Sequence, residues 1–125
     1  MNFTEIFKSV IDQDKAHVVI CDLNHTIIYM NPAAVKRYAK YGGAALVGKS
    51  LLNCHNTESR QMIQKVIDYF SSSNTHNIVH TYYNAKENRD VYMVALRNEK
   101  KELIGYYEKH EFRTKDETPL YDFSD

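Results

Sequence analysis

Apolar residues recur at helical spacing at the start of the chain, over residues 1–14. Asn2 is a good N-cap, and Glu5 lies three residues further on, as in a capping box. Charged residues such as Lys8 and Asp12 lie off the apolar stripe. The pattern therefore predicts an amphipathic helix that covers a sheet or a second copy of the chain, through the stripe Phe3, Ile6, Phe7, Val10 and Ile11.

Two further helices are predicted in the middle of the chain. Asn31 followed by Pro32 is a typical helix start, and Gly42-Gly43 is a typical end. The second helix is expected over residues 57–70, where the apolar positions again follow helical spacing. Residues 44–56 show no regular pattern.

Five short segments have the character of strands. They are rich in β-branched and aromatic residues and are separated by Asp, Asn and Gly turns. In residues 90–97 the side chains alternate, so that Val91 and Met93 face one side while Tyr92 and Val94 face the other. The predicted strands are residues 17–21, 26–30, 76–83, 90–97 and 103–112. Two strands, then helices, then three strands predict an α+β fold with an antiparallel sheet.

Composition narrows the class of protein. A chain of 125 residues suits one domain, and its formal net charge of +0 gives no basic field for nucleic acid. The start shows no signal peptide, and no apolar stretch is long enough to span a membrane. Two cysteines do not make a disulfide scaffold. We therefore expect a cytoplasmic protein that binds neither nucleic acid nor membrane.

The order of these motifs resembles the PAS domain family. The run from Val18 to Ala34 is similar to its opening signature: an apolar strand, an Asp-containing turn, an apolar strand, then Asn and an Ala-rich helix. Residues 48–52 resemble its Gly-containing loop, and residues 103–107 resemble its last strand. His25 stands where the family often has Gly. The resemblance covers residues 15–113, which leaves residues 1–14 as a separate helix and 114–125 as a tail.

The resemblance implies a five-stranded antiparallel sheet with helices packed on one face, plus the N-terminal helix. It also implies a cavity between sheet and helices, which in the family holds haem, flavin, another small molecule or nothing. The expected function is a non-enzymatic sensor that binds a small apolar or aromatic ligand and signals through a protein partner. The alternative is a ligand-free dimerisation or protein-interaction module. A homodimer is expected through the N-terminal helix.

The predicted pocket combines apolar side chains with polar ones that can orient a ligand. His55 precedes the long helix, where the haem-binding members of the family carry an iron ligand, so haem sensing is a special case of the sensor hypothesis. Helix capping or loop packing is the simpler role for His55. The predicted pocket residues are Ile28, Met30, Leu51, His55, Ile63, Val66, Tyr82, Val94 and Tyr106.

No catalytic or metal-binding motif is expected. Cys54 and His55 are neighbours whose side chains point apart in an extended segment, so they do not make a nucleophile and its base. His76 and His80 would lie about 13 Å apart in a strand, too far for one metal ion. The remaining acidic candidates are expected at the solvated surface; they are Glu58, Glu87, Asp90, Glu108 and Glu111.

Overall fold

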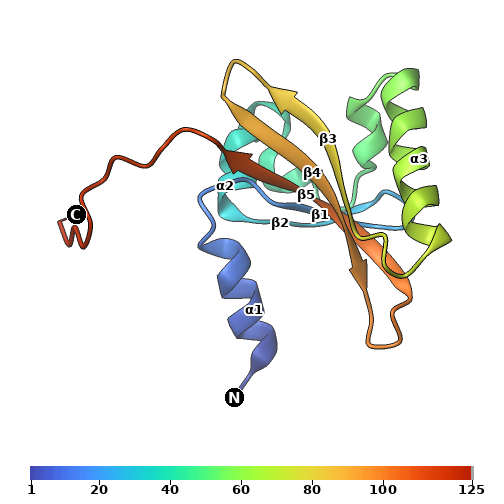
Figure 1. Cartoon of the computed structure of the whole chain (residues 1–125), viewed down its shortest axis with the longest axis horizontal. Helices are drawn as coiled ribbons and strands as arrows, with labels where there is room; N and C mark the ends of the chain where they lie inside the picture. Colours follow the sequence, from blue (N-terminus) through green and yellow to red (C-terminus); the bar gives the residue numbers. More distant parts are fainter. Residues whose placement is uncertain (125) are drawn as a thin grey trace.

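Five antiparallel strands form one sheet in the order β2-β1-β5-β4-β3 (Figure 1). The computed structural model of the protein describes residues 1–124. The strands are β1 (Val19–Asp22), β2 (Ile27–Met30), β3 (Ile78–Asn84), β4 (Arg89–Arg97) and β5 (Leu103–Phe112). The last strand in sequence therefore pairs with the first, which places β5 at the centre of the sheet.

The helices are α1 (Phe3–Asp12), α2 (Pro32–Arg37) and α3 (Thr57–Ser72), with three short 3₁₀ segments at Ala39–Tyr41, Gly43–Leu46 and Leu51–Cys54. The buried face of α3 packs against one face of the sheet and closes the core. Core residues shared by the two layers are Ile63, Val66, Ile67, Phe70, Met93 and Tyr106. This arrangement confirms the predicted α+β fold and its antiparallel sheet.

The helix predicted to run from Pro32 to the glycine pair is shorter in the structure. α2 ends at Arg37 because Tyr38 leaves the helical conformation, with φ −99° and ψ 17°. The chain continues in 3₁₀ turns to Gly42, whose φ of +121° suits glycine. These tight turns carry the chain toward the segment that precedes α3.

Asn31 joins four segments from inside the protein. Its side-chain oxygen accepts hydrogen bonds from the backbone N–H groups of Val18 (2.9 Å) and Ala34 (3.0 Å). Its amide nitrogen donates to the carbonyl oxygens of Ile11 (3.0 Å) and Ala16 (3.0 Å). The residue that sequence identifies as a helix cap therefore also fixes the end of α1 and the entry to β1.

In the turn between β1 and β2, His25 takes the left-handed backbone conformation that suits the glycine often found there in the family. His25 has φ +64°, in the left-handed region. Its backbone N–H donates to the carbonyl oxygen of Asp22, and its ring Nδ1 lies 2.8 Å from the hydroxyl oxygen of Tyr106.

Gly105 allows β5 to pair closely with β1. A Cβ added at Gly105 would overlap the carbonyl oxygen of Cys21 on β1, so only glycine fits at this position.

The two terminal segments project from the sheet and its covering helices (Figure 1). The predicted stripe on α1 is largely uncovered: Phe3, Phe7 and Val10 are 61%, 62% and 68% exposed. The chain after β5 runs outward and carries Leu120, Tyr121 and Phe123, all exposed. Within residues 1–124, no helix has both the length and the apolar character needed to cross a bilayer.

Candidate functional site

A pocket of about 590 Å³ lies between α3 and the face of the sheet that α3 covers. Its volume falls within the range of small-molecule sites in proteins. Part of its lining is apolar and includes Ile63 and Val66 from α3 and Val91 and Met93 from β4. A polar part of the lining, called the polar floor below, lies beside these β4 residues, since Val91 pairs with His110 and Met93 with Glu108; it consists of His17, Tyr38, Arg89, Glu108 and His110.

The two histidines of the polar floor stack on each other. The ring of His17 lies 3.6 Å from the ring of His110, centroid to centroid, with 26° between their planes. Tyr38 meets His17 edge-on at 5.8 Å. Both histidines are buried, at 3% and 8% exposure. The stack therefore forms a flat, aromatic surface inside the pocket.

Arg89 connects the polar floor to an ion-pair network. Its Nη2 donates to Oε1 of Glu87 at 3.2 Å, and Arg37 donates to the same carboxylate at 2.6 and 3.1 Å. The Nη1 of Arg89 contacts Nδ1 of His110. Because a guanidinium only donates, that Nδ1 accepts, and the ring proton of His110 resides on Nε2. This nitrogen lies 3.7 Å from the carboxylate of Glu108.

Burial controls the charge of these groups. Burial is the main reason that the pKa of His17 is lowered to about 3 and that of His110 to about 4; His110 also lowers the pKa of His17, and the nearby Arg37 and Arg89 contribute to both shifts. Both rings are therefore neutral at pH 7. Burial raises the pKa of Glu108, whereas the hydrogen bond from Arg37 lowers the pKa of Glu87 to about 2.

Two buried nitrogens of the polar floor have no hydrogen-bond partner among the described residues. They are Nε of Arg89 and Nε2 of His17, and the side chains that carry them are 5% and 3% exposed. An unsatisfied buried polar group costs about 1–3 kcal/mol. Other atoms of both side chains line the pocket.

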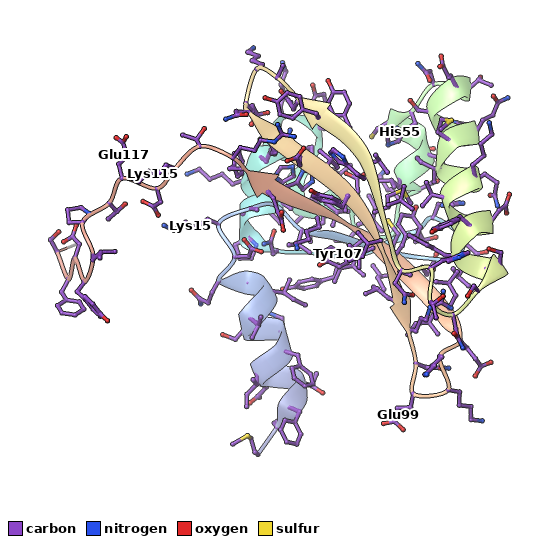
Figure 2. All side chains as sticks on the ribbon, in the orientation of Figure 1. Lys15, His55, Glu99, Tyr107, Lys115 and Glu117 are labelled. Atoms are coloured by element: carbon purple, nitrogen blue, oxygen red, sulfur yellow. The ribbon has the colours of Figure 1, made fainter. Side chains whose placement is uncertain are left out.

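His55 lies at the pocket, in the segment just before α3 (Figure 2). Asn56 caps α3 by accepting a hydrogen bond from the Ser59 N–H at 2.8 Å. The capping role is therefore carried by Asn56 and not by the imidazole of His55. Burial and the neighbouring Arg60 lower the pKa of His55, which keeps the ring neutral and leaves it with a nitrogen able to bind a metal ion.

Of the predicted pocket residues, the structure brings His55, Ile63, Val66 and Tyr82 together on the lining of the pocket. Met30, Leu51 and Tyr106 instead pack in or against the hydrophobic core. Ile28 is 53% exposed on β2. Val94 follows Met93 in β4 and so faces the other side of the sheet.

Sequence reasoning missed the polar floor, and it placed Glu108 and Asp90 at the solvated surface. In the structure Glu108 lines the pocket, and Asp90 is 7% exposed and paired with Arg113 at 2.7 Å. One signal was present in the sequence. Glu108 and His110 share the strand parity of the buried Tyr106, so the three side chains point to the same face.

The part of the chain that the structure describes, residues 1–124, contains no group of three or more His, Cys, Asp or Glu placed to hold a metal ion.

No curated protein matches the chain in sequence.

Solved structures show the same fold at low sequence identity. The PAS domain of a Colwellia psychrerythraea protein is 14% identical with a TM-score of 0.65, and the match covers 89% of this chain and 97% of that one. The PAS domain of BvgS from Bordetella pertussis is 14% identical with a TM-score of 0.61, covering 90% and 88%. The Aer2 receptor of Vibrio cholerae, described as a dual PAS-heme oxygen sensor, is 20% identical with a TM-score of 0.55, covering 78% and 94%.

A family model described as PAS domain matches residues 7–109, which include β1–β4, most of β5, α3 and all of the pocket lining except His110. The matched segment begins inside α1 and ends within β5, so it spans nearly all of the region that resembles the family in sequence. The chain therefore belongs to the PAS domain family.

Proposed function

We propose that the chain is a signal-sensing domain whose pocket binds a small ligand and whose state is read by another protein. The observation that carries this proposal is the pocket between α3 and the sheet, whose lining combines apolar side chains with buried polar ones. Such a combination suits a ligand with an apolar body and a polar head. Membership of the PAS family supports a sensory role.

A blocking substitution at the pocket tests ligand binding. Met62 lines the pocket and is 53% exposed, so the larger side chain of Met62→Trp is expected to occupy the pocket without disrupting the core. A ligand present at 100 times its Kd should stabilise the wild type by about 2.7 kcal/mol and raise its Tm by several degrees. That rise should disappear in Met62→Trp.

The control is Lys65→Trp, an exposed position on the same helix that is not part of the pocket lining. It should keep the full ligand-induced rise in Tm. Candidate ligands come from native mass spectrometry of the purified protein and from a thermal-shift screen. The proposal is wrong if no molecule co-purifies and no compound raises the Tm, or if Met62→Trp responds to a ligand as the wild type does.

Haem binding is a special case that the same sample tests. The observation in its favour is the neutral imidazole of His55 at the pocket. A haem-bound protein would show a Soret band, and His55→Ala would remove it. A Soret band that persists unchanged in His55→Ala would show that another residue is the ligand.

A second candidate function is homodimerisation through α1. A ten-residue helix is marginally stable alone in water, so it needs tertiary contacts. The apolar stripe that would make such contacts is largely exposed, and Phe3 stacks on Phe7 with ring centroids 6.0 Å apart. A second copy of the chain offers the same stripe, which makes a self-complementary contact.

Acidic substitutions on the stripe test the dimer. The double variant Phe7→Asp with Val10→Asp should raise the dimer Kd by at least about 100-fold, because a buried anchor such as Phe7 contributes about 2 kcal/mol or more and each new carboxylate would be buried without a partner. Ser9→Asp, which lies off the stripe, should leave the Kd unchanged. Light scattering after size-exclusion chromatography reads the result. A monomeric wild type, or a double variant that dimerises normally, contradicts this function.

A further inference from the structure

We infer that residues 118–123 of one copy of the chain dock as an added strand on the free edge of β3 in a second copy. The docked segment lies at the mouth of the pocket, where the lining residues Met62 and Tyr82 are exposed. This inference goes beyond the proposed function and does not depend on ligand binding. It follows from a bare sheet edge, from apolar side chains beside that edge and from a projecting segment that has the matching properties.

The two edges of the sheet differ in what covers them. At the β2 edge, the N–H of Ile27 donates to the carbonyl oxygen of Lys49 (2.9 Å), and the N–H of Gly48 donates to the carbonyl oxygen of Ile27 (2.7 Å). β3 has β4 as its single neighbour in the sheet, and within residues 1–124 no backbone hydrogen bond joins its outer side to another segment. The unpaired backbone groups of an edge strand are a template for a further strand.

β3 lacks the residues that commonly protect an edge strand. It contains no lysine, proline or acidic residue over its 7 residues. Ile78 and Tyr82 are 59% and 61% exposed on it. The register shifts between His80 and Tyr82, which bends the strand and leaves a short regular stretch on each side of the shift. A short extended segment therefore fits this edge.

The helix α3 supplies a second wall beside the edge. Met62 and Tyr69 lie about two turns apart on one side of α3 and are 53% and 45% exposed. Met62 lines the pocket together with Val79 and Tyr82 of β3. Tyr69 stacks on His76, just before β3, with ring centroids 4.0 Å apart. A peptide on the edge would therefore bury side chains against the helix as well as pair with the strand.

The segment that follows β5 has the matching properties. Leu120, Tyr121 and Phe123 are 90%, 87% and 89% exposed. No backbone hydrogen bond joins residues 118–123 to the sheet or its helices. The other uncovered apolar element, α1, is helical, so most of its backbone groups are already paired within the helix. Residues 118–123 therefore offer both the free backbone and the apolar side chains that an added strand needs.

The direction of this segment assigns it to another copy. The N–H of Arg113 donates to the carbonyl oxygen of Asn88 (2.9 Å), and its guanidinium donates to Asp90 at 2.7 and 2.8 Å. From this fixed point the chain runs away from β3 and α3 (Figure 1). β4 also separates β5 from the β3 edge of the same chain. Two copies related by a two-fold axis would exchange their segments reciprocally, which closes the assembly as a dimer.

Mixing full-length chains tests the inference. The acceptor is an isotope-labelled variant with Leu120→Ser, Tyr121→Ser and Phe123→Ser, which removes exposed side chains and so should not disturb the fold. Unlabelled wild type is then added. The amide NMR signals of Ile78–Asn84 in the acceptor should shift, because the segment of the wild type pairs with the free edge. At saturation, hydrogen exchange of the edge amides should slow at least about 10-fold.

Two controls assign the contact. Unlabelled triple variant, added in place of wild type, should bind the β3 edge at least about 10-fold more weakly, because it lacks the buried aromatic anchors. Tyr82→Lys in the acceptor should weaken the binding of wild type by a similar factor, since a lysine protects an edge strand. Ile28→Lys, at a 53% exposed position on β2, should leave it unchanged. If Tyr82→Lys does not fold, Met62→Lys on the facing helix should give the same loss.

The outcomes separate this inference from the other proposals. If wild type leaves the β3 signals of the acceptor unmoved at millimolar concentration, the inference is wrong. If the triple variant shifts them as strongly as wild type does, residues 118–123 are not the occupant. If only signals of α1 shift, the copies associate through the apolar stripe of α1 and not through the β3 edge. The thermal-shift screen decides the ligand-binding function separately in each case.

Discussion

The Asn31→Ala variant is expected to be about 3–5 kcal/mol less stable than the wild type. The Asn31 side chain is fully buried, at 0% exposure, and its oxygen accepts from the N–H groups of Val18 and Ala34. Its amide donates to the carbonyl oxygens of Ile11 and Ala16. Alanine removes these four bonds and a longer one from the amide to the carbonyl oxygen of Asp14 (3.4 Å), and it leaves the buried N–H groups unpaired, at a cost of about 1–3 kcal/mol for each unpaired group. Urea unfolding measures the difference.

Asn56→Ala is the matched control for this variant. Asn56 is also an asparagine N-cap, but it is exposed and its side chain accepts one hydrogen bond, from Ser59. Loss of such a cap costs about 1 kcal/mol. Equal destabilisation by the two substitutions would show that Asn31 acts only as a helix cap and does not join the four segments.

Acidification from pH 7 to pH 5 should destabilise the protein through the stacked histidines. The folded-state pKa values of His17 and His110, about 3 and about 4, lie below the ordinary value of 6.5. As the pH falls through 6.5 the unfolded chain takes up protons at these residues while the folded protein does not. Stability is therefore lost between about pH 7 and pH 4, by as much as about 2 kcal/mol per histidine at pH 5.

Other charged groups around the stack change this dependence. Arg37 and Arg89 stay charged and oppose protonation of both rings, while the carboxylate of Glu87 favours it. Burial raises the folded-state pKa of Glu108, so the folded protein binds that proton at higher pH than the unfolded chain does. Protonation of Glu108 therefore adds stability on acidification and offsets part of the loss. A single-residue comparison is needed to isolate the histidine contribution.

His17→Phe provides that comparison, since phenylalanine retains the ring stack but does not titrate. The loss of unfolding free energy between pH 7 and pH 5 should be smaller in this variant than in the wild type by about 2 kcal/mol. If His17→Phe lost as much unfolding free energy between pH 7 and pH 5 as the wild type does, His17 would be accessible to protons in the folded protein.

The positions of the strands and of α3 along the chain were predictable because each element rests on a local pattern. Residues 103–112 were predicted as a strand, and they form β5 with those bounds. The alternation in residues 90–97 was also correct, since Val91 and Met93 lie on one face. The same alternation did not show which face of the sheet is covered by α3. Val94 was therefore included among the predicted pocket residues, although its side chain faces the other side of the sheet.

The polar floor was not predictable because its members are far apart in sequence. His17, Arg89 and His110 meet only because β5 lies between β1 and β4, an order that no local pattern encodes. Polar residues in a strand are usually solvated, and Glu108 was assigned to the surface on that ground. Their burial becomes evident only when the strand order is combined with the position of α3.

The interior amide of Asn31 also determines how α1 can meet a partner. The bond from this amide to the carbonyl of Ile11 holds the last turn of α1, so the helix leaves the sheet in a set direction even though its apolar stripe is bare. A surface that is preorganised in this way loses less conformational entropy on association than a freely moving helix would. Whatever covers the stripe therefore meets it at an angle that the monomer has already set.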